Sequence, residues 1–308
     1  MTEAVACYDC GSPQCDHFID AEDDLGGRPG RFRFVRCARC GLVYQNPRIP
    51  LEAIKGWYDE EYIAHRKKSD WGILTPLYNH AMERHDRRKL ALVERYVPLG
   101  AESRVLDIGC GAGTFLAMAA KRHGCAVTGV DFKDLSQLPW MKAIEFRCGL
   151  LREQHFDGRE FDLVTMWHFL EHDYEPRRTL ATARALLAPG GRLVIEVPRL
   201  DSVSFALFRE RWPGLQAPQH TALYSWSSLR SMASRERLEI VAHLPYGAFP
   251  AYFYLFAGVA FKLLKGRGLN LARAVYPYFL GELLLLPLLL FEKQLNLAMQ
   301  TIVLRRTQ

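Results

Sequence analysis

A chain of 308 residues in which 49% are hydrophobic can bury a full core, so a disordered protein is excluded and one large domain with an appendage is expected. The formal net charge of +6 at pH 7 is mild for this length and gives only weak support to a nucleic-acid or anionic-membrane partner. Residues 1–24 are acidic and lack an apolar core segment, so no signal peptide is expected and we predict a cytoplasmic protein.

Four of the eight cysteines form two matched pairs near the start of the chain. In each pair two residues separate the cysteines, and a glycine follows the second one. In a reducing compartment this spacing indicates a metal site rather than disulfides, and four thiolates suit tetrahedral Zn²⁺. Cys15 and His17 lie nearby and remain alternative ligands. We predict a zinc ribbon over residues 1–48, in which a structural Zn²⁺ is bound by Cys7, Cys10, Cys37 and Cys40.

A segment rich in aromatic and charged residues follows the ribbon and includes Trp57, Tyr58 and Tyr62. Residues 76–96 are predicted as a helix, and the basic run from His85 to Lys89 is interpreted as its solvated face. Residues 49–97 are therefore expected to form a helical linker. Two roles remain open for it, because it could cover a ligand site as a lid or only pack against the main domain.

The centre of the chain contains a predicted strand that runs into a glycine-rich turn. The strand covers residues 104–108 and contains Asp107 near its end. A turn of this kind at the carboxyl end of a strand lets a ligand approach bare backbone. A second predicted strand ends on Asp131, close to the ~20-residue spacing of a ribose-binding carboxylate. Both carboxylates are expected to face one nucleoside, together with the turn glycines Gly109, Gly111 and Gly113.

Strands and helices alternate beyond this turn, which predicts a parallel, Rossmann-like α/β sheet over residues 98–308. Pro189-Gly190-Gly191 is interpreted as a break before the fifth strand. A dinucleotide-binding dehydrogenase is disfavoured, because Thr114 stands where the GxGxxG pattern requires glycine. The predicted strands are 104–108, 126–131, 143–147, 161–166, 192–197, 238–244 and 297–304.

Three motifs, in order from residue 104 to residue 198, resemble class I S-adenosylmethionine-dependent methyltransferases: VLDIGCGAGTF, FDLVTMWHFLEH and LLAPGGRLVIEVP. The resemblance implies S-adenosylmethionine (SAM) as cofactor, with the glycine turn around its methionine part and Asp131 on its ribose hydroxyls. The position after the third strand often carries an acidic or amide side chain in this family. None is present here, so an apolar adenine contact is expected. The expected cofactor residues are Asp107, Gly109, Gly111, Gly113, Asp131, Leu150 and Trp167.

Candidate catalytic residues follow the fourth predicted strand. His168, Glu171 and His172 are spaced i, i+3 and i+4, so they would share one face of a helical turn. The resemblance brings His220 over the same pocket. One histidine could be a general base for a hydroxyl acceptor. Alternatively, HxxEH with His220 resembles the ExxEH-plus-His metal site of small-RNA 2′-O-methyltransferases. In a third interpretation, Glu171 and His172 only cap the helix that begins near Glu175 and hold the edge of the sheet.

Residues 245–296 are predicted as an insertion between the sixth and seventh strands. It contains two apolar runs, 249–261 and 283–291, and the second is interrupted by Pro287. Neither run approaches the ~20 residues needed to cross a bilayer. The runs could pack together, line an apolar pocket, or lie on the inner face of a membrane with nearby basic residues toward the head groups. These basic residues are Lys262, Lys265, Arg267 and Arg273.

These features predict an enzyme that transfers a methyl group from SAM to a small or lipid-linked acceptor of the sugar, lipid or quinone type. A hydroxyl oxygen is the expected methylated atom. RNA methylation is the main alternative, because zinc ribbons also accompany rRNA methyltransferases. However, the fourth strand lacks the Asn/Asp-Pro-Pro-Tyr signature and no basic patch is evident, so a nucleic-acid partner is not expected. A non-catalytic cofactor-binding scaffold is disfavoured by the intact Asp107 and glycine turn.

Overall fold

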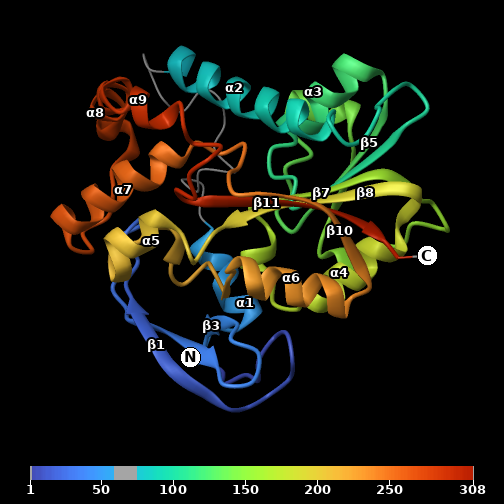
Figure 1. The fold of residues 1–308 in the computed structure, drawn as a ribbon. Coiled ribbons are helices and arrows are strands. Elements are labelled where there is room, and N and C mark those ends of the chain that lie inside the picture. The colour runs from blue at the N-terminus through green and yellow to red at the C-terminus, as the bar shows by residue number, and fades with distance from the viewer. Residues whose placement is uncertain (1, 59–74, 308) are drawn as a thin grey trace.

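A computed structural model describes residues 2–58 and 75–307, and Figure 1 shows a twisted central sheet between two layers of helices. The strand order of this sheet is β10-β11-β8-β7-β4-β5-β6. Neighbouring strands are parallel except at β11, which is antiparallel to both β8 and β10. The predicted Rossmann-like α/β fold is therefore confirmed. The strands are β4 (Arg104–Ile108), β5 (Ala126–Asp131), β6 (Glu145–Cys148), β7 (Phe161–Trp167), β8 (Leu187–Pro198), β10 (Leu238–Leu244) and β11 (Met299–Arg306).

Helices cover both faces of this sheet, because its parallel strands are apolar on both sides. Side chains alternate along β4, so Val105 belongs to the same buried cluster as Phe115 of α3, whereas Leu106 clusters with Leu180 of α4 on the opposite face. Figure 1 shows α2 and α3 on one side of the sheet and α4 and α6 on the other. These helices are α2 (Thr75–Val93), α3 (Thr114–His123), α4 (Pro176–Ala185) and α6 (Trp226–Arg235).

The N-terminal unit is a second, antiparallel sheet with the strand order β1-β2-β3-β9. Its fourth strand, β9 (Ala222–Leu223), comes from the segment between β8 and α6. The N-terminal strands therefore pair with a segment of the large domain, and Tyr44 of β3 is fully buried in the main core. The other elements of this part are β1 (Cys15–Ala21), β2 (Phe32–Cys37), β3 (Val43–Gln45) and α1 (Leu51–Ile54).

The expected insertion lies between β10 and β11 and is helical. One side of α7 is buried through residues such as Ala257 and Phe261, whereas α8 and α9 expose many leucines. Among the described residues, no helix combines the length and the apolar character that a membrane span requires. Tyr62 and the side chain of Arg273 lie outside what the structure describes. The helices are α7 (Ala251–Leu264), α8 (Leu271–Leu284) and α9 (Leu286–Leu289), and α5 (Val203–Phe208) packs beside α7.

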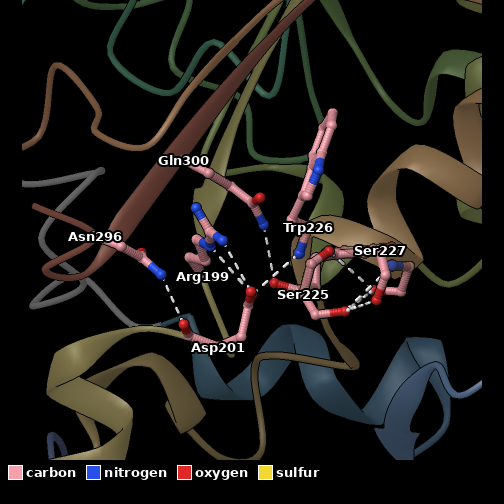
Figure 2. A network of polar contacts seen from close by, with 9 residues as sticks. Arg199, Asp201, Ser225, Trp226, Ser227, Asn296 and Gln300 are labelled. Atoms are coloured by element: carbon pink, nitrogen blue, oxygen red, sulfur yellow. Dashed lines mark hydrogen bonds and ion pairs between the residues drawn. The ribbon is translucent and has the colours of Figure 1, made fainter. Parts of the chain in front are cut away.

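A polar network connects the end of this insertion with the sheet and α6 (Figure 2). The Asn296 side chain donates a hydrogen bond of 2.6 Å to the carbonyl oxygen of Asp201. The Asp201 carboxylate accepts hydrogen bonds from the Arg199 side chain and from the backbone N–H of Trp226. Asp201 thus fixes three segments at the carboxyl end of β8.

Several predicted boundaries were wrong for identifiable reasons. β8 begins at Leu187, because the Pro189-Gly190-Gly191 segment continues the strand instead of breaking it. A side chain at Gly191 would approach the carbonyl oxygen of Phe161 to 2.9 Å, so only glycine allows this close pairing. β6 begins two residues late because a 3₁₀ turn ends at Ala143. The 3₁₀ turns are η1 (Lys55–Trp57), η4 (Pro139–Ala143), η5 (Leu151–Glu153), η6 (Leu170–His172), η7 (Arg209–Arg211) and η8 (Pro213–Leu215).

Candidate functional site

The glycine-rich turn after β4 is held open by backbone geometry and by one carboxylate. Gly109 and Gly111 have φ values of 75° and 51°, and a Cβ atom at Gly109 would overlap the ring of Phe169. The backbone N–H of Gly111 donates to Oδ2 of Asp131 over 2.8 Å, and the N–H of Lys133 donates to Oδ1 over 3.0 Å. Asp131 is therefore fixed at the end of β5, beside bare backbone that a ligand can approach.

Asp107 lies at the same edge, 3% exposed. Its Oδ1 accepts a hydrogen bond of 2.7 Å from the hydroxyl of Thr165 in β7. Burial raises the pKa of Asp107 to about 7, although the Lys89 ammonium opposes this shift. Lys89 is also 3.6 Å from the carboxylate of Asp86 and lies over the ring of Trp167. The turn is thus surrounded by buried charged groups from α2, β4 and β5.

A cavity of about 330 Å³ extends from this turn. One part of its wall is the glycine turn, and another consists of aromatic side chains of the insertion, including Phe249, Phe253 and Tyr254. Gly113 is not part of the wall. It is the N-cap of α3 with a φ of 68°. The predicted site residues on the wall are Asp107, Gly109, Gly111, Asp131, Leu150, Trp167, His168, Glu171, His172 and His220.

His168 belongs to a group that includes Glu196 and His85. Its Nε2 lies 3.1 Å from Oε1 of Glu196, which is fully buried in β8. Burial by itself raises the pKa of Glu196, but His168 and the backbone N–H groups of Ala248 and Phe249 outweigh it and hold this pKa below its usual range. Glu196 therefore carries a negative charge beside the imidazole and also binds the start of the insertion.

Glu171, His172 and His220 form a separate group. The rings of His172 and His220 meet edge to face with their centroids 4.4 Å apart. Nδ1 of His220 donates a hydrogen bond of 2.8 Å to the carbonyl oxygen of Gly214, and burial lowers the pKa of His220 to about 3. Burial raises the pKa of Glu171, which is 1% exposed, to about 8.

The expected common helical face of His168, Glu171 and His172 is wrong. The η6 turn contains only Leu170–His172, and His168 precedes it with a φ of 54°. The two histidines therefore enter different groups, although Nδ1 of His168 remains 3.8 Å from Oε1 of Glu171. Glu171 and His172 do not cap α4, because neither carboxylate oxygen of Glu171 has a hydrogen-bond partner in the described part of the chain and Nδ1 of His172 contacts Tyr58 and Gln219 instead.

The four cysteines of the two pairs come together in the N-terminal sheet. Their sulfur atoms lie within 4.8 Å of one another, and each pair closes a turn through an N–H of the following glycine. The alternative ligands point elsewhere: Asn46 donates to the sulfur of Cys15, and His17 pairs with Asp20. The residues that could hold a tetrahedral metal ion are Cys7, Cys10, Cys37 and Cys40.

A family model described as "Methyltransferase domain" matches residues 78–243, which is more than half of the chain. The chain belongs to this family. With the seven-stranded α/β sheet, this match places the chain among the class I SAM-dependent methyltransferases.

Two curated relatives of the methyltransferase are called "Ubiquinone biosynthesis O-methyltransferase". The protein of Coxiella burnetii (strain Dugway 5J108-111) is 34% identical over 112 residues, which is 34% of this chain and 47% of the relative. The protein of Pseudomonas aeruginosa (strain LESB58) is 34% identical over 104 residues, covering 31% and 44%. The chain thus spans about half the length of the curated relatives it matches.

Solved structures with a similar chain course include the [4+2]-cyclase SpnF and the CcbJ methyltransferase from Streptomyces caelestis. SpnF aligns with 72% of this chain and 81% of its own at 16% identity and a TM-score of 0.49. CcbJ aligns with 73% of this chain over 96% of its own length, at 14% identity and a TM-score of 0.47.

Two residues of the methyltransferase site were missed from the sequence. Glu196 interrupts the apolar run of a buried strand, and a charge in such a place nearly always has a specific partner, so this signal was available. His85 was predicted to lie on a solvated face of α2, together with the rest of the basic run from His85 to Lys89. This prediction is wrong for three residues of the run. His85, Asp86 and Lys89 line the cavity, and only the intervening Arg87 and Arg88 are exposed.

Proposed function

We propose that this methyltransferase methylates a hydroxyl oxygen of a small, largely apolar acceptor, such as a phenolic quinone precursor or a lipid-linked molecule. The observation that carries this proposal is the composition of the cavity wall. It combines the glycine turn with Phe249, Phe253 and Tyr254 of the insertion. The aromatic part of the wall would select the apolar body of an acceptor. The curated relatives, which are named ubiquinone biosynthesis O-methyltransferases, support the same acceptor class.

The residues present fit SAM. The turn exposes backbone where a Cβ atom could not be placed, and Asp131 offers a buried carboxylate beside it. We assign Asp107, Gly109 and Gly111 to the methionine part, Asp131 to the ribose, and Leu150 and Trp167 to apolar contact. SAM supplies an electrophilic methyl group on a sulfonium.

In this proposal His168 removes the acceptor proton. Its Nε2 faces the carboxylate of Glu196, so this nitrogen carries the proton and Nδ1 is the acceptor nitrogen of the ring. The buried negative charge of Glu196 stabilises the imidazolium that forms when His168 takes the hydroxyl proton. Glu196 is a positioning residue here, since it acts through His168.

Replacement of His168 by alanine is expected to lower kcat by about 10²–10⁴-fold, the usual contribution of a general base. Affinity for SAM, measured by calorimetry, should remain close to that of the wild type. His155→Ala, which changes an exposed histidine outside the cavity wall, is the matched control. A His168→Ala protein with full turnover would refute the assignment of this base.

The acceptor class is tested by methyl transfer from SAM that is labelled in its methyl group. The label should enter the lipid or quinone fraction of a cell extract. It should resist alkali, because a methyl ether is stable to base and a methyl ester is not. Incorporation confined to the RNA fraction would instead support the alternative RNA methyltransferase, and incorporation into sugar nucleotides would contradict the apolar acceptor.

We further propose that the exposed apolar surface of the insertion contacts an anionic membrane. This α8–α9 surface consists of the side chains of Tyr276, Leu280, Leu283, Leu284, Leu290 and Phe291, which are 58–71% exposed. An apolar surface of this kind is unusual on a soluble monomer. The exposed cations Lys262, Lys265 and Arg267 lie in the same insertion and suit anionic head groups.

Co-sedimentation with anionic vesicles tests the membrane contact. The wild type is expected to bind weakly and to dissociate in high salt, because each cation near such a surface contributes only ~1 kcal/mol. Changing Leu283, Leu284, Leu290 and Phe291 to serine should abolish binding while SAM affinity persists. Leu289 is only half-exposed and is left unchanged. Val241→Ser, which alters an exposed residue of β10, should bind vesicles like the wild type. Failure of the wild type to sediment would refute the contact.

A further inference from the structure

The buried carboxylate of Glu171 has an unusual environment. Its side chain is almost completely buried and lies on the cavity wall. In the described part of the chain, neither of its carboxylate oxygens has a hydrogen-bond partner. A buried carboxyl group without a partner costs folding free energy, so such a group usually has a function or a ligand that satisfies it.

Two histidines present nitrogen atoms to the same place. One donor atom from each of Glu171, His172 and His220 lies within 4.8 Å of the other two. The hydrogen bond from Nδ1 of His220 to the carbonyl oxygen of Gly214 fixes the ring and makes Nε2 its acceptor nitrogen.

The N-terminal sheet holds this histidine from outside. The Gln45 side chain of β3 donates to the carbonyl oxygens of Pro218 and His220, over 3.3 and 3.2 Å. The backbone N–H of Gln45 also donates a hydrogen bond of 2.8 Å to the carbonyl oxygen of Thr221. These contacts fix the backbone that carries His220, and the hydrogen bond from its ring to Gly214 is the kind of outer contact that orients histidine ligands of metals.

We propose that Glu171, His172 and His220 form a binding site for a divalent transition-metal ion on the wall of the cavity. Two imidazole nitrogens and one carboxylate oxygen suit Mn²⁺, Fe²⁺, Co²⁺ or Zn²⁺, and the open side of the site faces the cavity. His168 is not part of this ligand set, because its donor atom groups with those of His85 and Glu196 instead. The site therefore differs from the HxxEH arrangement suggested by the sequence.

The bound cation would supply the missing partner of the Glu171 carboxylate and offer an open coordination position to an oxygen atom. If the acceptor is a hydroxyl compound, a role that rests on the proposed function, the metal would bind that oxygen and favour its deprotonated form. His168, 3.8 Å from Glu171, is close enough to act on the same hydroxyl.

Mn²⁺ binding to the full-length protein, measured by electron paramagnetic resonance, tests the site without any methyl transfer. Mn²⁺ prefers oxygen and nitrogen ligands, so the cysteine group does not compete for it. We expect one Mn²⁺ per chain in the wild type. Glu171→Gln and His220→Asn should each weaken binding by at least about tenfold, since even outer-sphere changes have effects of that size. His168→Ala should leave Mn²⁺ affinity unchanged.

Melting curves of the variants separate loss of the ligand from loss of the fold. Glu171→Gln keeps the size of the side chain and removes an unpaired buried acid, so its melting temperature in the absence of metal should not fall. An absence of Mn²⁺ binding by the wild type would overturn the metal site. An equal loss in His168→Ala and Glu171→Gln would overturn this ligand set. Retention of methyl transfer to a hydroxyl in a protein that binds no Mn²⁺ would reject the metal and leave the proposed function intact.

Discussion

Asp131→Ala is expected to weaken SAM binding by about 1–3 kcal/mol, the usual cost of losing hydrogen bonds to a charged group. Two effects combine in this change. The ribose hydroxyls lose the carboxylate that we assign to them. The backbone N–H of Gly111 also loses its acceptor 2.8 Å away, so the glycine turn is held less firmly. Isothermal calorimetry with SAM and with its demethylated product measures the effect directly.

Asp134→Ala is the matched control, because Asp134 is an exposed carboxylate of the same loop that accepts a hydrogen bond from the backbone N–H of Ser136. Its replacement should leave SAM affinity unchanged. An Asp131→Ala protein with wild-type affinity would place the ribose at another residue.

Cys37→Ser is expected to release zinc and to destabilise the N-terminal sheet. We propose one structural Zn²⁺ per chain at the four-cysteine group. Metal binding in such small units is coupled to folding and is worth ~10–16 kcal/mol in isolated zinc fingers. The ribbon has little core of its own, although its β3 strand pairs with β9 of the large domain. Elemental analysis should show that the zinc content falls from one ion per chain in the wild type to nearly none in Cys37→Ser. The melting temperature of the variant should also be lower than that of the wild type.

The consequence should reach the cavity as well. Gln45 of β3 bonds to the backbone around His220, so disorder of the ribbon is expected to lower methyl transfer more than SAM affinity. Cys15→Ser is the control, because Cys15 lies outside the four-sulfur group. The ligand set would be wrong if Cys15→Ser released zinc as completely as Cys37→Ser. A zinc-free wild-type protein would refute the site itself.

The sequence by itself determined the features that depend on neighbouring residues. The buried strands, the turn after β4 and the carboxylates at the ends of β4 and β5 were predictable because strand alternation and glycine conformation are local properties. The two cysteine pairs were also recognisable from the sequence, because the spacing within each pair involves only four neighbouring residues. The parallel α/β sheet was expected from the alternation of strands and helices and from the resemblance to a known family, whereas the order of its strands was not predicted.

Only the tertiary structure decided which distant side chains meet. Glu196 reaches His168 because β8 lies beside β7, and His85 reaches the cavity because α2 packs beside α3, whose first residues also line it. The division of HxxEH between two groups depends on the φ of 54° at His168, which no helical pattern anticipates. The exposure of the leucines in α8 and α9, and the addition of β9 to the ribbon, likewise depend on how segments pack. Packing depends on the free energy of all contacts in the core, so it cannot be predicted from the pattern of residues in one segment.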